Sequence, residues 1–156
     1  MVASRVTSMD LFEIAGLPLH PLIVHAVVVL VPLTALALVL GSLFPAVRRR
    51  LGIVTPIAAL LVLALIPVTV LAGEALAQQV GPVPAVVRHA ELGRMLWPWT
   101  AAMFLVAVAQ WCWHRFGAPG RGTRVILAVL AIVSAAGSTI MVVLIGEAGA
   151  RAVWGG

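Results

Sequence analysis

The sequence has very little charge and no lysine. Only 10% of its 156 residues are charged, whereas 63% are hydrophobic, and the mean hydropathy is +1.17. Soluble domains carry about 25% charged residues, so this composition excludes a soluble globular protein and predicts an integral membrane protein. The net charge of +5 comes from arginine alone. Arginine in a membrane protein sets its topology, and we therefore expect no nucleic acid partner.

Cysteine is almost absent as well. Cys112 is the only one, which excludes an intramolecular disulfide, a CxxC site and an iron–sulfur cluster held by this chain alone. We interpret Cys112 as a small apolar residue. Hydrolase motifs, glycine-rich phosphate loops and nucleophile–base sets are missing too, so the sequence contains no catalytic motif.

Long hydrophobic runs are what the chain has in abundance. Four apolar segments almost fill its length. The first, as a helix of about 33 Å, is long enough to cross the hydrocarbon core of a bilayer. The pattern predicts an all-α fold, a transmembrane four-helix bundle. We expect its spans at about 22–43, 54–73, 96–114 and 125–145.

The chain divides at the start of the first span. Residues 1–19 form a predicted extracytoplasmic N-terminal segment, and residues 20–156 form the four-span membrane domain. From Ser8 to Ala15 we expect a short interfacial helix, because its apolar residues can face lipid while its acids face water. Gly16 and Pro18 end that helix.

Arginine-rich loops predict how the bundle lies in the membrane. The loops after the first and third spans contain arginine and no acid. By the positive-inside rule these loops face the cytoplasm, and both termini are then extracytoplasmic. The arginines concerned are Arg48, Arg49, Arg50, Arg115, Arg121 and Arg124.

Acids and histidines gather on the opposite, outer side. Only His114 lies with the basic loops, where we expect it to be solvated. Ionisable groups that enter a span usually face protein, a ligand or water rather than lipid. One group per helix can converge at the outer face, as in the cofactor sites of helical bundles. These groups are His25, Glu74, His89 and Glu147.

Two kinds of ligand site fit these residues. A b-type haem can be held by imidazoles from two helices, here His25 and His89, although Ala26 is the only small residue near His25. A transition metal suits histidine nitrogens combined with carboxylates. Its predicted ligands are His20, His25, Glu74, His89, Glu91 and Glu147. Spacing does not decide between the two, and His20 and His25, about 140° apart around a helix, do not form an i,i+4 zinc pair.

The same residues also fit a purely structural role. Glu147 and Arg151 are four residues apart and can pair on one helix face. Glu74 can pair with Arg88 or Arg94 across the outer loop. In this interpretation the polar cluster only holds the helices together.

Four stretches of the chain resemble one known family. Together they are similar to the bacterial membrane family catalogued as domain of unknown function 2231, and the opening HPxxxH is their most specific motif. The resemblance implies a four-span, multi-pass protein of the bacterial cytoplasmic (plasma) membrane. The stretches are Leu17-Pro-Leu-His-Pro-Leu-Ile-Val-His25, Ala72-Gly-Glu-Ala-Leu76, Arg88-His-Ala-Glu-Leu-Gly93 and Gly146-Glu-Ala-Gly-Ala-Arg-Ala-Val-Trp154.

The resemblance also implies redox work at the outer face, because some members of the family are joined to Rieske-type iron–sulfur domains. Members often carry histidine where this chain has Glu147, a departure that weakens the case for haem. The positions that match the family pattern are His20, His25, Glu74, His89 and Glu91.

We therefore predict a small, redox-associated integral membrane protein with a histidine/carboxylate site for haem b or a transition metal at its extracytoplasmic face. If redox-active, it is an electron-transfer module rather than a stand-alone enzyme, and its partner is a redox or iron–sulfur protein. The alternative is a non-catalytic structural or scaffolding membrane subunit. In both cases the lipid bilayer surrounds the protein.

Overall fold

Five helices make up almost all of the described chain. A computed structural model describes every residue except 1–12, 15–16, 82, 119 and 156. A short helix, α2 (Pro45–Leu51), follows the first long one. The four long helices, each apolar and long enough to cross a membrane, are α1 (Leu19–Leu43), α3 (Val54–Val80), α4 (Pro84–Phe116) and α5 (Arg121–Trp154). The predicted all-α transmembrane four-helix bundle is confirmed.

The structure differs from the prediction just before α1. Two very short strands, β1 (Glu13–Ile14) and β2 (Leu17–Pro18), pair in antiparallel fashion. The interfacial helix expected from Ser8 to Ala15 is therefore not formed at Glu13 and Ile14, and most of that stretch lies outside the described residues. Isolated helices shorter than about 12 residues are marginal, which accounts for the difference.

The helices extend past the predicted spans at the end of the bundle where α1 begins. α3 continues through Gly73 to Val80, and α5 continues through Gly149 to Trp154. Gly81, with a φ of 89°, follows α3 in a backbone conformation that glycine adopts readily. Gly73, at the end of the predicted second span, and Gly149, in the extension of α5, both lie on helix faces that turn toward the bundle interior.

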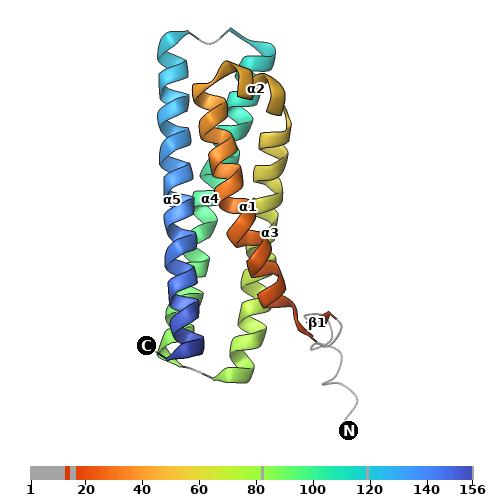
Figure 1. The fold of residues 1–156 in the computed structure, drawn as a ribbon, viewed down its shortest axis with the longest axis vertical. Helices are drawn as coiled ribbons and strands as arrows, with labels where there is room; N and C mark the ends of the chain where they lie inside the picture. The colour runs from red at the N-terminus through yellow and green to blue at the C-terminus, as the bar shows by residue number, and fades with distance from the viewer. Residues whose placement is uncertain (1–12, 15–16, 82, 119, 156) are drawn as a thin grey trace.

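The four long helices run up and down and occupy the corners of a bundle (Figure 1). α1 packs against α3 and α5, and α4 packs against the same two helices, so α1 and α4 are diagonal neighbours. The start of α1 and the end of α5 share one end of the bundle, which we call the histidine end because His20 and His89 lie there. The opposite end, which we call the arginine end, carries α2 with Arg48, Arg49 and Arg50.

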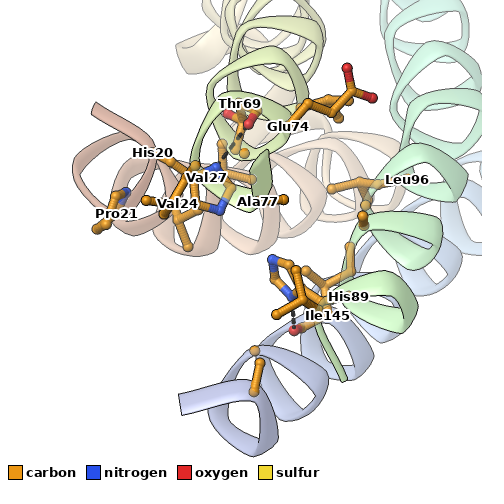
Figure 2. A pocket seen from close by; sticks show the side chains of 18 of the residues that line it. His20, Pro21, Val24, Val27, Thr69, Glu74, Ala77, His89, Leu96 and Ile145 are labelled. Carbon is orange, nitrogen blue, oxygen red and sulfur yellow. Dashed lines mark hydrogen bonds between the residues drawn. The ribbon is translucent and has the colours of Figure 1, made fainter. Parts of the chain in front are cut away.

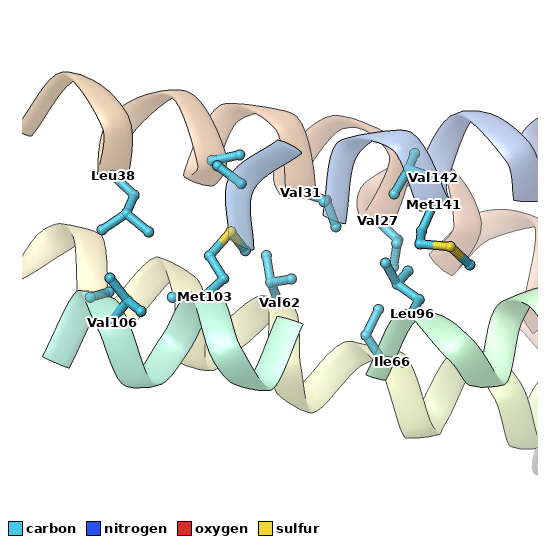
Figure 3. Packing of buried hydrophobic residues seen from close by; sticks show 14 of the residues in the cluster. Val27, Val31, Leu38, Val62, Ile66, Leu96, Met103, Val106, Met141 and Val142 are labelled. Carbon is cyan, nitrogen blue, oxygen red and sulfur yellow. The ribbon is translucent and has the colours of Figure 1, made fainter. Parts of the chain in front are cut away.

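The interior is filled with apolar side chains of medium size (Figure 3). Val31, Leu38, Val62 and Met103 are almost completely buried and come from three different helices. Many large apolar side chains lie instead on the outside, as expected for helices that contact lipid. α5 adds a face of small residues, which lets its neighbours approach closely. Its buried small residues include Ala131, Ser134, Ala135 and Ser138.

Candidate histidine pair at one end of the bundle

His20, the second residue of α1, reaches across to α3. Its Nδ1 lies 2.9 Å from the carbonyl oxygen of Thr69. A carbonyl oxygen can only accept a hydrogen bond, so Nδ1 carries the proton and Nε2 keeps its lone pair. Gly73 lies directly against the ring, because a Cβ at this position would sit 2.8 Å from Cε1 of His20. A side chain at Gly73 would therefore displace the imidazole.

His89 in α4 repeats this arrangement with α5. Its Nδ1 donates to the carbonyl oxygen of Ile145 at 3.0 Å. Gly149, one helical turn further along α5, lies against the ring, with the position of a Cβ 3.2 Å from Cε1 and Nδ1. In α3, Gly73 likewise follows the hydrogen-bond acceptor Thr69 by one helical turn. Each helical hairpin therefore surrounds its histidine with the same two features, a carbonyl acceptor and a glycine one turn later.

The two imidazoles meet across the middle of the bundle because their helices are diagonal neighbours. The ring centroids of His20 and His89 are 6.0 Å apart, and the ring planes are nearly perpendicular, at 87°. Figure 2 shows both rings projecting into one pocket toward each other, with the Nδ1 of His89 turned away toward Ile145. The two Nε2 atoms are thus the nitrogens left to bind a ligand.

An apolar cavity of about 370 Å³ surrounds this histidine pair. All four long helices line it. Its volume falls within the range of about 300–1,000 Å³ that is usual for ligand and cofactor pockets. Small residues on three of the helices leave room for a flat ligand. They are Gly73, Ala77, Ala90, Gly93, Gly149 and Ala152. The sequence had suggested little such room, because Ala26 is the only small residue near His25.

Two of the acids expected to join the histidines are paired with arginine instead. Oε1 of Glu74 accepts a hydrogen bond from Arg94 at 2.8 Å, and Oε1 of Glu147 accepts one from Arg151 at 2.6 Å. Glu74 also lines the cavity, whereas Glu147 is not among the described residues that do so. Both pairs are well exposed, and both are the ones that the structural interpretation anticipated.

His25 and Glu91 lie on exposed positions. Nδ1 of His25 donates to the carbonyl oxygen of Pro21 in its own helix, at 2.5 Å. Because α1 already begins at Leu19, His20 is fixed on the inner face, and His25, about 140° further around the helix, is directed outward. The histidine that faces His89 is therefore His20, and His25 is not among the described residues that line the cavity.

The six residues expected to bind a metal are not brought together. Within the described part of the chain, no group of three or more histidine, cysteine, aspartate or glutamate side chains could hold a metal ion. The residues that complete the pair, Thr69, Gly73, Ile145 and Gly149, were not identified from the sequence. The two glycines do lie in stretches that carry the family resemblance.

The fold and the site define a class: small multi-pass membrane proteins of four long helices with an inward-facing histidine pair. The family model described as a predicted membrane protein (DUF2231) matches residues 16–156. The chain belongs to this family of membrane proteins. No curated protein and no solved structure matches it.

Proposed function

We propose that His20 and His89 are the two axial ligands of a haem, and that the protein is an electron-transfer module of the membrane. The observation that carries the proposal is the placement of the two imidazoles, with their ring centroids 6.0 Å apart and each Nδ1 bonded to a backbone carbonyl oxygen, which leaves both Nε2 atoms for a ligand. A ligating histidine nitrogen lies about 2.0 Å from its metal, so imidazoles on opposite sides of one iron have ring centroids roughly 6 Å apart.

The hydrogen bonds of the two histidines support this role. A metal-ligating histidine almost always donates its other ring N–H to a carbonyl, a carboxylate or water, which fixes the tautomer and makes the ligating nitrogen more basic. The carbonyl oxygens of Thr69 and Ile145 accept these bonds. Each imidazole is thereby oriented by a helix other than its own.

Haem fits the site better than a bare metal ion does. Haem brings its own four in-plane nitrogens and takes one or two axial ligands from the protein, whereas a bare transition metal usually takes about four protein or water ligands. The described residues offer two histidines, and Glu74 beside them is paired with Arg94. The departure from the family pattern at Glu147 matters little here, because that side chain is exposed and paired with Arg151.

The orientation of the bundle is part of the same proposal. Arginine-rich connections at the arginine end favour a cytoplasmic location for that end. The histidine end then faces the outside of a bacterial cytoplasmic membrane, and both termini are extracytoplasmic. A redox partner, such as an iron–sulfur protein, would exchange electrons with the haem there.

A structural role is the second candidate, because each histidine also joins two helices. His20 links α1 to α3, and His89 links α4 to α5, through hydrogen bonds to the backbone. In this case no cofactor binds, and replacing either histidine only lowers the stability of the bundle.

Absorption spectra of the detergent-purified protein, oxidised and reduced, separate these two functions when haem and metals are quantified in the same sample. We expect one haem per chain, with a Soret band that shifts on reduction. His20→Ala and His89→Ala should lose this band. His25→Ala is the matched control and should keep it, because His25 is exposed and bonded within its own helix. A colourless protein from haem-sufficient cells, or a spectrum that depends on His25 but not on His20, would refute the proposal.

A further inference from the structure

A second cavity, of about 410 Å³, lies at the arginine end of the bundle. It is lined by residues of α1, α2, α3 and α4, among them Arg48, Arg49 and Arg115. No acidic side chain occurs among the described residues that line it. The cavity is therefore a concave basic site, separated from the histidine pair by the length of the bundle.

Arg48 turns from α2 back toward α1. Its Nη1 donates to the carbonyl oxygen of Gly41 at 3.2 Å, which leaves other N–H groups of the guanidinium for a ligand. The pKa of Arg48 is lowered, first by burial and then by the positive charges of Arg124 and Arg49. Positive charges crowded around a cavity without a facing carboxylate attract an anion.

His114 adds a buried polar atom to the same cavity. The sequence predicted a solvated residue, but His114 lies within α4, and its Nδ1 donates to the carbonyl oxygen of Gln110 at 2.7 Å. Its Nε2 is buried and has no hydrogen-bond partner among the residues that the structure describes. An unpaired buried polar atom is unfavourable, and a ligand atom at this position would relieve it.

We propose that this cavity binds a phosphate group, carried by an anionic phospholipid or free in solution. Guanidinium groups match phosphate oxygens with paired, charge-assisted hydrogen bonds, and Arg48, Arg49 and Arg115 supply them. Nε2 of His114 is the further polar atom that a hydrogen bond from the ligand would satisfy. Basic pockets between transmembrane helices are known to bind phospholipid headgroups, and the apolar lining residue Leu38 continues the cavity toward the bundle interior.

Lipid binding to the full chain in mild detergent tests this proposal. Native mass spectrometry would compare phosphatidylglycerol with phosphatidylcholine, and thermal unfolding would be followed with added inorganic phosphate. We expect Arg48→Gln and Arg49→Gln each to weaken binding of the phosphate-bearing ligand by about tenfold. Arg50→Gln is the matched control, because Arg50 follows in the same helix, is exposed and is not among the described lining residues.

The outcomes distinguish the two sources of phosphate. Preference for phosphatidylglycerol that depends on Arg48 and Arg49 identifies a lipid, whereas stabilisation by inorganic phosphate with the same dependence identifies the free anion. Equal affinity for both lipids without an effect of phosphate overturns the proposal, as does an equal loss of binding in Arg50→Gln. His114→Leu is a second variant if the arginine variants do not fold. It removes the unpaired atom, so the protein should fold at least as stably and yet bind more weakly.

Discussion

Alanine at Gly73 is the substitution that should disturb the histidine pair most selectively. The new Cβ would lie 2.8 Å from Cε1 and 2.9 Å from Nδ1 of His20. An ordinary van der Waals contact begins at 3.4 Å, so the distance from this Cβ to Cε1 must grow from 2.8 Å to 3.4 Å. The ring must therefore move by about 0.6 Å. Movement of the ring weakens its hydrogen bond to the carbonyl oxygen of Thr69 and turns Nε2 away from the position opposite His89.

The effect on the fold should be small by comparison. Alanine is favoured over glycine in a helix interior by about 1 kcal/mol. The loss of one hydrogen bond costs about 0.5–1.5 kcal/mol. The two effects of Gly73→Ala therefore nearly cancel, and we expect the free energy of unfolding to change by less than about 1 kcal/mol. Disturbing the groups that orient a metal ligand, in contrast, typically lowers affinity by roughly 10–100-fold.

Haem titration of the purified variants measures this difference. Gly73→Ala should bind haem roughly 10–100-fold more weakly than the unmodified chain, while its unfolding temperature stays nearly the same. Gly149→Ala should have a milder effect, since its Cβ would be 3.2 Å from His89. Gly146→Ala is the control on α5, because a Cβ there meets nothing within 4 Å. Unchanged haem affinity and an unchanged spectrum in Gly73→Ala would show that His20 is not a ligand.

Three further predictions concern packing and topology. Gly137→Ala places a methyl group in the space of the Trp99 indole, and overpacking of this kind should destabilise the bundle by about 1–3 kcal/mol in chemical denaturation; an unchanged midpoint would show that the indole moves freely. Gln110→Ala removes a buried amide that donates hydrogen bonds to neighbouring helices, and should lower the free energy of unfolding by about 1 kcal/mol. Gln110→Leu should lower it by less, because the leucine side chain fills the space that alanine leaves empty. Gly122→Cys in a Cys112→Ser background should react with a membrane-impermeant thiol reagent only after cells are opened, because this position lies at the arginine end; labelling of intact cells would reverse the proposed orientation.

Much of the fold was predictable because lipid imposes a simple requirement. Backbone polar groups must be paired within each span, so long apolar runs become helices whatever their detailed sequence. The number of long helices, their order and the separation of Arg48–Arg50 from the histidine end followed from this rule. The ion pairs of Glu74 and Glu147 were also foreseen, because spacing along or between helices was sufficient to suggest them.

Sequence patterns were less informative where the outcome depended on a helix boundary. The predicted first span begins at about residue 22 and leaves His20 outside it, whereas α1 begins at Leu19. This small difference decides which histidine faces inward. The expected interfacial helix fails at Glu13 and Ile14 for a related reason, since a short segment is controlled by its neighbours rather than by its own propensity.

By itself, the sequence determined that this is a four-span helical membrane protein with its basic loops at one end and most of its acids and histidines at the other. Hydrophobicity and charge are properties of single residues, so summing them over a stretch of the sequence is enough to locate the spans and the basic loops. Only the tertiary structure decided that His20 faces His89, since their contact joins residues 69 positions apart on diagonal helices. The same holds for the carbonyl oxygens and glycines that orient the rings, because a backbone group has no sequence signature and becomes a partner only when two helices pack together.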